Sequence, residues 1–270
     1  MIERGTREQI KGFLEGFIQG IINEHKSSPL NPKELRPAKK FSEEGDIKPF
    51  HEALLPDGIL RVTEFERSFS TKLGTTFEEV AKLIGKDNYA IAERGHVVSG
   101  KVSPSAIKKI ESIVDKIGSG GMQKSYSKLV KEVVKISMKK GETRRKTADL
   151  YLKDNRGNEI FFEIKSPKPN KGQCLEATDR LLQIHAIRRL SSPRVRTYYA
   201  MAYNPYGDDK KSYAHSFSRR YMDLKNQVLI GKEFWDLIGG KGTYKEVLRV
   251  YREVGKEKGP DMIDQLALGY

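Results

Sequence analysis

Two carboxylates and one ammonium group lie close together near the middle of this chain. Residues 147–166 read TADLYLKDNRGNEIFFEIKS, in which two runs of β-forming residues flank the turn-forming stretch DNRGN. This pattern predicts a β-hairpin. If residue 153 pairs with residue 159 across the loop, Asp149 lies directly opposite Glu163, with the two Cβ atoms about 5 Å apart.

The predicted hairpin would gather these charged groups on one face. Side chains alternate in direction along a strand, so Glu163 and Lys165 point the same way and Asp149 joins them by direct pairing. The opposite face would be apolar and would supply a reason to fold, and it consists of Ala148, Leu150, Leu152, Ile160, Phe162 and Ile164.

Such a cluster is suited to holding a metal ion. Two carboxylates at this separation repel each other unless a cation lies between them, and hard oxygen ligands suit Mg²⁺. A metal there could support phosphodiester hydrolysis, with Lys165 orienting the attacking water. The alternative is a surface hairpin with an ordinary salt bridge, because the bare pattern often occurs by chance. The apolar back of the hairpin and the basic character of the chain favour the metal site.

The charge balance indicates a polyanionic partner. Fifty Lys and Arg residues against 36 Asp and Glu residues give a formal net charge of +14, and such an excess favours nucleic acid. Cys174 is the single cysteine, which excludes an internal disulfide and a cysteine-cluster metal site and fits a reducing cytoplasm. No run of 18 apolar residues is present, so we expect neither secretion nor membrane insertion.

Hydrophobic periodicity predicts helices on either side of the hairpin. They cover residues 6–25, 104–117, 126–139, 174–190, 232–240 and 244–254. A buried strand is expected at 195–203, after the helix at 174–190. Thr75 and Thr76 are possible helix caps, so we expect two helices around Gly74. His185 lies inside a predicted helix, where we interpret it as a packed residue and not as a general base.

Several segments resemble a known enzyme class. TAD…EIKSPKPNKGQ is similar to the Asp-x(n)-Glu-x-Lys core of PD-(D/E)XK nucleases, with Ala148 in place of the proline that often precedes the aspartate. Three segments resemble type II restriction endonucleases of the TdeIII-like group, which cut GGNCC sites. They are EFERSFSTKLGTTFEEVAKLI (64–84), EIKSPKPN (163–170) and KEFWDLIGG (232–240).

The resemblance implies a fold and an activity. It implies an α/β fold with a restriction-endonuclease-like core, in which helices flank a central mixed sheet. We expect a helical N-terminal region and linker at 1–57 and a nuclease domain with integrated DNA-recognition elements at 58–270, together forming one compact domain. The expected activity is site-specific cleavage of both strands of DNA in a bacterial or archaeal cytoplasm. A palindromic site fits a homodimer, and a restriction system implies a cognate DNA methyltransferase.

The resemblance also assigns roles to residues. Asp149, Glu163 and Lys165 would be catalytic, and the backbone carbonyl of Ile164 would join the two carboxylates in binding Mg²⁺, for which Mn²⁺ could substitute. Enzymes of this class often supply a further acid from a helix before the hairpin. The candidates for that acid are Glu66, Glu79 and Glu142.

A basic and aromatic stretch after the last predicted strand is the candidate for DNA contact. Residues 206–220 read YGDDKKSYAHSFSRR, a mixture suited to phosphates and base edges. The candidate residues are Asn204, Tyr206, Lys210, Lys211, His215, Arg219 and Arg220.

Two other functions remain open from the sequence. A basic DNA-binding protein without catalysis would bind DNA without metal and give no product. A structure-specific or repair nuclease of the same superfamily would use the same residues on branched DNA, and cleavage of a short linear duplex would distinguish it from a restriction enzyme.

Overall fold

A computed structural model describes residues 2–25, 50, 55, 57–137 and 141–262. They fall into two compact units, a larger one within residues 1–7 and 77–247 and a smaller one within 8–76 and 248–270. The boundary between them passes through helix α3 (Asp57–Asn88). Almost all of the expected linker lies outside the described residues.

The smaller unit is helical. It contains most of α1 (Arg4–His25), the first part of α3 and most of α9 (Thr243–Met262). Lys11 of α1 pairs with Glu257 of α9 at 2.8 Å. The rings of Phe17 and Phe69 lie 5.7 Å apart between centroids.

The prediction of two helices around Gly74 was wrong, since α3 continues through this position. The hydroxyl of Thr75 donates to the carbonyl of Lys72, and that of Thr76 donates to the carbonyl of Leu73. Both threonines therefore bond back to the preceding turn of one continuous helix, and neither caps a new one.

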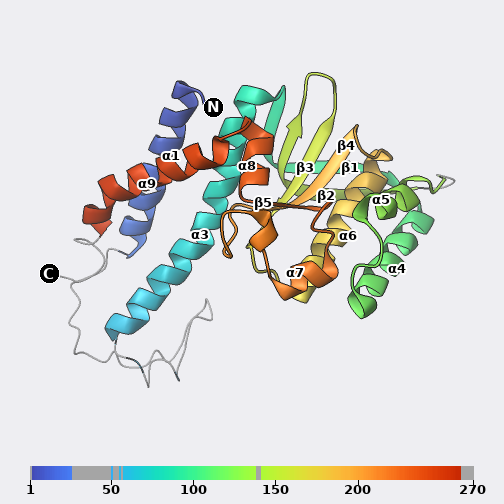
Figure 1. Cartoon of the computed structure of the whole chain (residues 1–270), viewed down its shortest axis with the longest axis horizontal. Coiled ribbons are helices and arrows are strands. Elements are labelled where there is room, and N and C mark those ends of the chain that lie inside the picture. The colour runs from blue at the N-terminus through green and yellow to red at the C-terminus, as the bar shows by residue number, and fades with distance from the viewer. Residues whose placement is uncertain (1, 26–49, 51–54, 56, 138–140, 263–270) are drawn as a thin grey trace. The chain divides into compact units, whose positions relative to one another are not determined.

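The larger unit is built on a five-stranded mixed sheet (Figure 1). Its strands are β1 (Ile91–Val102), β2 (Glu142–Lys153), β3 (Glu159–Ile164), β4 (Val195–Met201) and β5 (Val228–Ile230), in the order β1-β2-β3-β4-β5. The pairs β1–β2 and β2–β3 are antiparallel, whereas the pairs β3–β4 and β4–β5 are parallel. The predicted mixed sheet is confirmed.

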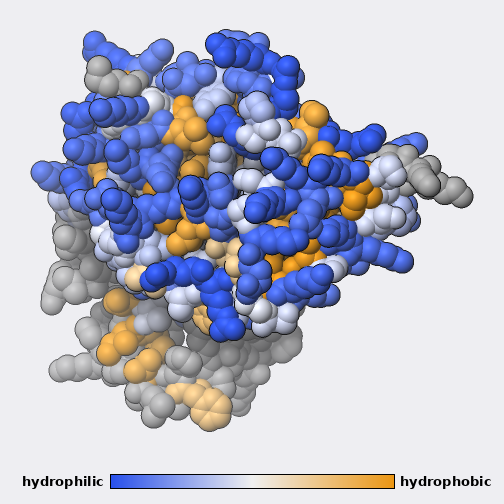
Figure 2. All heavy atoms as spheres, turned by 45° about the vertical axis from the view of Figure 1, so that its right-hand side comes forward, coloured by the Kyte–Doolittle hydropathy of each residue, from blue (hydrophilic) through white to orange (hydrophobic). Residues whose placement is uncertain are grey.

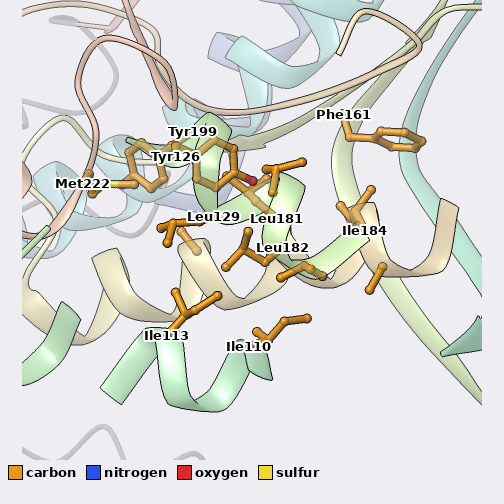
Figure 3. Packing of buried hydrophobic residues seen from close by; sticks show 14 of the residues in the cluster. Ile110, Ile113, Tyr126, Leu129, Phe161, Leu181, Leu182, Ile184, Tyr199 and Met222 are labelled. Atoms are coloured by element: carbon orange, nitrogen blue, oxygen red, sulfur yellow. The ribbon is translucent and has the colours of Figure 1, made fainter. Parts of the chain in front are cut away.

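One face of the sheet packs against α6 (Lys171–Arg188), with α4 (Pro104–Gly120) and α5 (Tyr126–Val134) packed against α6 in turn. Figure 3 shows Leu181 and Leu182 of α6 among the buried side chains that join these layers. The side chain of Ser103 caps α4 by accepting a hydrogen bond from the N–H of Ala106. Helix α5 ends at Val134, earlier than the predicted Lys139, which itself lies outside the described residues.

The other face packs against α8 (Lys232–Gly239) and the end of α3. Phe234 meets Phe162 edge to face at 5.6 Å between ring centroids. At Gly85 an added Cβ would lie 2.7 Å from a Leu152 methyl group and 3.1 Å from the Ala92 Cβ, so the glycine favours the close approach of α3 to the sheet. Because both faces are covered, the face that carries Asp149 and Glu163 also buries Tyr151 and Phe161.

The chain beyond β4 forms the short helices η1 (Lys210–Ser212) and α7 (Ser216–Tyr221). On the face drawn in Figure 2, hydrophilic residues cover most of the coloured surface, with hydrophobic patches between them. Among the described helices, none has the length and apolarity that crossing a membrane requires.

Candidate active site

The hairpin register is the predicted one. Residues 150–153 of β2 pair with 162–159 of β3, from Leu150 opposite Phe162 to Lys153 opposite Glu159. Asp149 and Glu163 are the next residues beyond this ladder, one on each strand. At this point the backbone N–H of Ile164 donates to Asp149 Oδ2 at 2.7 Å, which holds the aspartate carboxylate against β3.

The three sequence-predicted residues come together. The ammonium Nζ of Lys165 lies 3.0 Å from Asp149 Oδ2 and 3.1 Å from Glu163 Oε1. The Glu163 side chain is only 3% exposed, whereas that of Lys165 is 42% exposed. The cluster therefore combines a buried carboxylate with a cation that solvent or substrate can reach.

Burial and charge perturb this cluster. Burial raises the pKa of the Glu163 carboxyl, and the nearby Asp149 carboxylate raises it further, against the opposing charges of Lys165 and Arg180. Burial by itself would lower the pKa of Lys165, but the two carboxylates outweigh it and the pKa is raised. The ammonium of Lys165 therefore stays charged. Any further cation near Glu163 would stabilise the ionised form of its carboxyl group.

The donor set fits a hard divalent ion that retains water. Among the described residues, no three His, Cys, Asp or Glu side chains converge to hold a metal by themselves. Asp149 and Glu163 offer carboxylate oxygens around an exchangeable ammonium, and Ile164 lies between Glu163 and Lys165 on the strand. Mg²⁺ commonly binds through one or two carboxylates and keeps several waters.

The candidate helix acids do not all lie near this cluster. Glu142 lies too far away, because it begins β2 seven residues before Asp149, about 23 Å along the strand. Glu79 is on α3, where it pairs with Arg94 at 2.9 Å and with Lys82. Glu66 is in the smaller unit, where it accepts a hydrogen bond from Ser70.

The acid near the cluster is Glu78, which the sequence analysis missed. Burial raises its pKa, and the charges of Asp149 and Lys165 act on it, so it lies within their electrostatic reach. Arg94 of β1 holds its Oε2 at 2.8 Å. The sequence carries a signal for it, because Glu78, Ala81 and Gly85 share one helix face, and small residues mark the face that approaches the sheet.

A second cation at the cluster was also missed. Arg180 of α6 donates from Nη1 to Glu163 Oε2 at 3.0 Å and from Nη2 to Glu176 Oε1 at 3.0 Å. The Glu176 contact has the i, i+4 spacing of a helix and is visible in the sequence. The Glu163 contact depends on how α6 crosses the sheet.

Some of the candidate DNA-contact residues organise the chain after β4. The side chain of Asn204 donates to the carbonyl of Asp209 and accepts from the N–H of Tyr206. Lys210 binds the carbonyl of Val228 and pairs with Glu233, each at 2.7 Å.

His215 likewise has a local role, since its ring accepts from the N–H of Ser218 at the start of α7. Its pKa is lowered by partial burial and by Lys168.

The other candidates are exposed and cationic or aromatic, namely Tyr206, Lys211, Arg219 and Arg220. Two lysines outside the predicted set accompany them. Lys168 lies over the ring of Tyr206 at 5.7 Å, and Lys171 lies over that of Tyr221 at 5.4 Å. Because Lys168 follows Lys165 by three residues, this basic surface begins next to the carboxylate cluster in the chain.

His185 is a packed residue, as predicted. It is 2% exposed, with Nδ1 at 2.7 Å from the carbonyl of Leu190 and Nε2 at 3.1 Å from the hydroxyl of Thr197. Burial lowers the pKa of its imidazole to about 4. The neutral ring therefore belongs to the core between α6 and β4.

Comparison with known proteins identifies the family. The model of the family "Type II restriction endonuclease, HinfI" matches residues 6–255. The type II restriction enzymes HgiEI and HgiCII of Herpetosiphon aurantiacus are 41% and 40% identical over 269 and 268 residues, with 97% of each chain covered. MjaII of Methanocaldococcus jannaschii is 25% identical over 222 residues, 76% of this chain and 58% of that enzyme. The chain thus belongs to the HinfI family of type II restriction endonucleases and is a site-specific deoxyribonuclease.

Proposed function

We propose that this restriction endonuclease cuts both DNA strands by Mg²⁺-dependent phosphodiester hydrolysis at the cluster of Asp149, Glu163 and Lys165. The observation that carries the proposal is the Lys165 ammonium, at 3.0 and 3.1 Å from the two carboxylates. The register of a hairpin buried on both faces holds these groups in place.

Each residue has a role in this proposal. Asp149, Glu163 and the carbonyl of Ile164 would hold Mg²⁺, with Mn²⁺ able to substitute. When bound, a divalent ion supplies charge neutralisation at the phosphate and a water of lowered pKa. Lys165 donates a hydrogen bond to the attacking water, because its ammonium is the exposed group of the cluster.

Glu78 is the proposed helix acid, in place of Glu66, Glu79 and Glu142. Its carboxylate is held by Arg94 and lies within the electrostatic reach of Asp149 and Lys165. An acid at this position can bind a water of the metal shell and orient it toward the phosphate.

The proposed DNA surface combines the exposed part of the predicted set with two further lysines. It consists of Tyr206, Lys211, Arg219, Arg220, Lys168 and Lys171, while Asn204, Lys210 and His215 shape the segment that carries it. The arginines would read guanine through O6 and N7. This suits the GGNCC site that the resemblance to the TdeIII-like group implies.

A twofold homodimer would place one cluster on each strand of such a palindromic site. A cognate DNA methyltransferase would protect the same site in the host.

Plasmid cleavage tests the proposal. Wild-type protein and Glu163→Gln are incubated with plasmid DNA in Mg²⁺ and, separately, in EDTA. We expect discrete fragments in the wild-type Mg²⁺ lane alone, with fragment ends that map to GGNCC. Discrete fragments that map to another sequence would overturn only the proposed site. A mobility shift without cleavage in any lane would overturn catalysis at this cluster.

A further inference from the structure

We propose that Arg180 is a positioning residue for cleavage, acting by holding one oxygen of Glu163 so that the other faces Asp149. This inference rests on the proposed function of the cluster. No part of the sequence motif includes Arg180, because it lies 15 residues beyond Lys165 on another element.

The two oxygens of Glu163 have different partners. Oε2 accepts from Arg180 at 3.0 Å, and Oε1 lies 3.1 Å from Lys165, which also contacts Asp149. A carboxylate rotates freely about its last torsion unless a partner holds it. The guanidinium therefore fixes the plane of the carboxylate, and with it the direction in which the oxygen opposite Arg180 faces.

The guanidinium is itself held at both ends. Its Nη2 donates to Glu176, so its planar fork spans two carboxylates with one nitrogen for each. A lysine ammonium is a compact point charge on a flexible stem and lacks this fixed geometry. The position thus uses a property specific to arginine.

Helix α6 gives Arg180 a rigid base. The helix begins with a capping box between Asn170 and Gln173. Ala177 and Leu181, which flank Arg180 on the helix, are 3% and 1% exposed. The arginine side chain consequently extends from a fixed point in the packed layer toward β3.

Arg180 also affects the charge available to the reaction. Without it, the ammonium of Lys165 would be the nearest positive charge to both Asp149 and the buried Glu163. Two carboxylates and two cations balance the cluster. Lys165, the exposed cation, then remains free to exchange its partners for water or phosphate.

The same helix offers a matched control. Arg188 lies eight residues later and pairs with Glu159 of β3 at 3.1 Å, so it is a second arginine from α6 on a β3 carboxylate. Glu176→Gln is a further control, because its amide oxygen can still accept from Nη2 of Arg180 and the contact with Glu163 is left intact.

The experiment compares Arg180→Ala, Arg180→Lys, Arg188→Ala and Glu176→Gln by single-turnover cleavage with saturating enzyme. We expect Arg180→Ala to lower the rate constant by about 30-fold or more, and Arg180→Lys to recover part of that loss. Arg188→Ala and Glu176→Gln should stay within about twofold of wild type, although Arg188→Ala should melt at a lower temperature.

Crystal structures of Arg180→Ala and Arg188→Ala supply a readout apart from activity. We expect the Glu163 carboxylate to be rotated or disordered in the first variant and unchanged in the second. An unchanged Glu163, or equal cleavage rates for the two alanine variants, would overturn the positioning role. If Arg180→Ala does not fold, Arg180→Lys is compared with Arg188→Lys, and equal rates would again overturn it.

Failure of the proposed function gives a different result. In that case Glu163→Gln would cleave like wild type, whatever the behaviour of the arginine variants.

Discussion

Two carboxylates on the same face of β3 have different surroundings. Glu159 and Glu163 are four residues apart, about 13 Å along the strand, and each receives an arginine from α6. Glu159 accepts a hydrogen bond from the Tyr151 hydroxyl at 2.8 Å and forms an ion pair with Arg188 at 3.1 Å. The single carboxylate of Glu159 is therefore balanced by the single cation of Arg188.

At Glu163 a second carboxylate has been added across the hairpin. Asp149 brings a negative charge close to it, and the exposed Lys165 bridges both groups. An arrangement built only for stability gains little from two facing carboxylates. Glu159 and Glu163 thus each bind an arginine of α6, and the added acid with the accessible ammonium distinguishes Glu163, where we propose catalysis.

The largest expected effect separates the two glutamates. Glu163→Gln should lower cleavage about a thousandfold or more, equivalent to about 4 kcal/mol, because it removes a charge from the proposed metal site. Glu159→Gln should keep wild-type cleavage and lower the free energy of unfolding by about 1 to 3 kcal/mol. Single-turnover rates and urea denaturation measure both. Loss of cleavage in Glu159→Gln comparable to that in Glu163→Gln would break the comparison.

Acidic pH should lower the free energy of unfolding through His185 on α6, the helix that carries both Arg180 and Arg188. His185 lies on α6 between the two arginines, and its folded-state pKa of about 4 lies below the ordinary 6.5. The unfolded chain takes up a proton near pH 6.5 while the folded chain does not, so stability present above pH 6.5 is lost as the pH falls toward 4. The full loss is about 3 kcal/mol.

Urea denaturation at pH 7.5 and pH 4.5 tests this titration. His185→Asn should be less stable than wild type at pH 7.5, with a smaller further loss at pH 4.5. The same loss in both proteins would show that other groups account for the acid sensitivity.

Glu78 is expected to act only at the proposed catalytic cluster. Glu78→Gln should lower the cleavage rate about 10- to 100-fold with DNA binding in EDTA unchanged, since a water-orienting acid contributes less than a metal ligand. Glu79→Gln is the matched control, because Glu79 is the next residue and binds the same Arg94. If the two variants cleave equally, Glu78 has no special part in the site.

The smallest effect concerns the structural end. Tyr151→Phe removes the hydroxyl that donates to Glu159 and should cost about 1 to 2 kcal/mol of unfolding free energy. Its cleavage rate at 25 °C should equal that of wild type, as thermal melts and rate measurements can show. A marked fall in rate would mean that the two ends of the hairpin are coupled.

The contrast between predicted and missed residues follows sequence distance. The hairpin could be predicted because its turn and its alternating strands are local, and pairing across a five-residue loop leaves one register that buries both runs. That register brought Asp149, Glu163 and Lys165 together. Glu142 was misassigned as a helix acid because β2 extends back to this residue, beyond the run of β-forming residues that predicts the hairpin.

What the sequence by itself determined is the local part of the site, namely the paired carboxylates, the lysine beside them and the basic character of the chain. Only the tertiary structure decided that Glu78 is the nearby helix acid and that Arg180 holds Glu163. These contacts depend on how α3 and α6 cross the sheet, which the close approach at Gly85 and the packing of Leu181 set. Crossings of this kind arise from the volumes of side chains distant in sequence, and no local pattern encodes them.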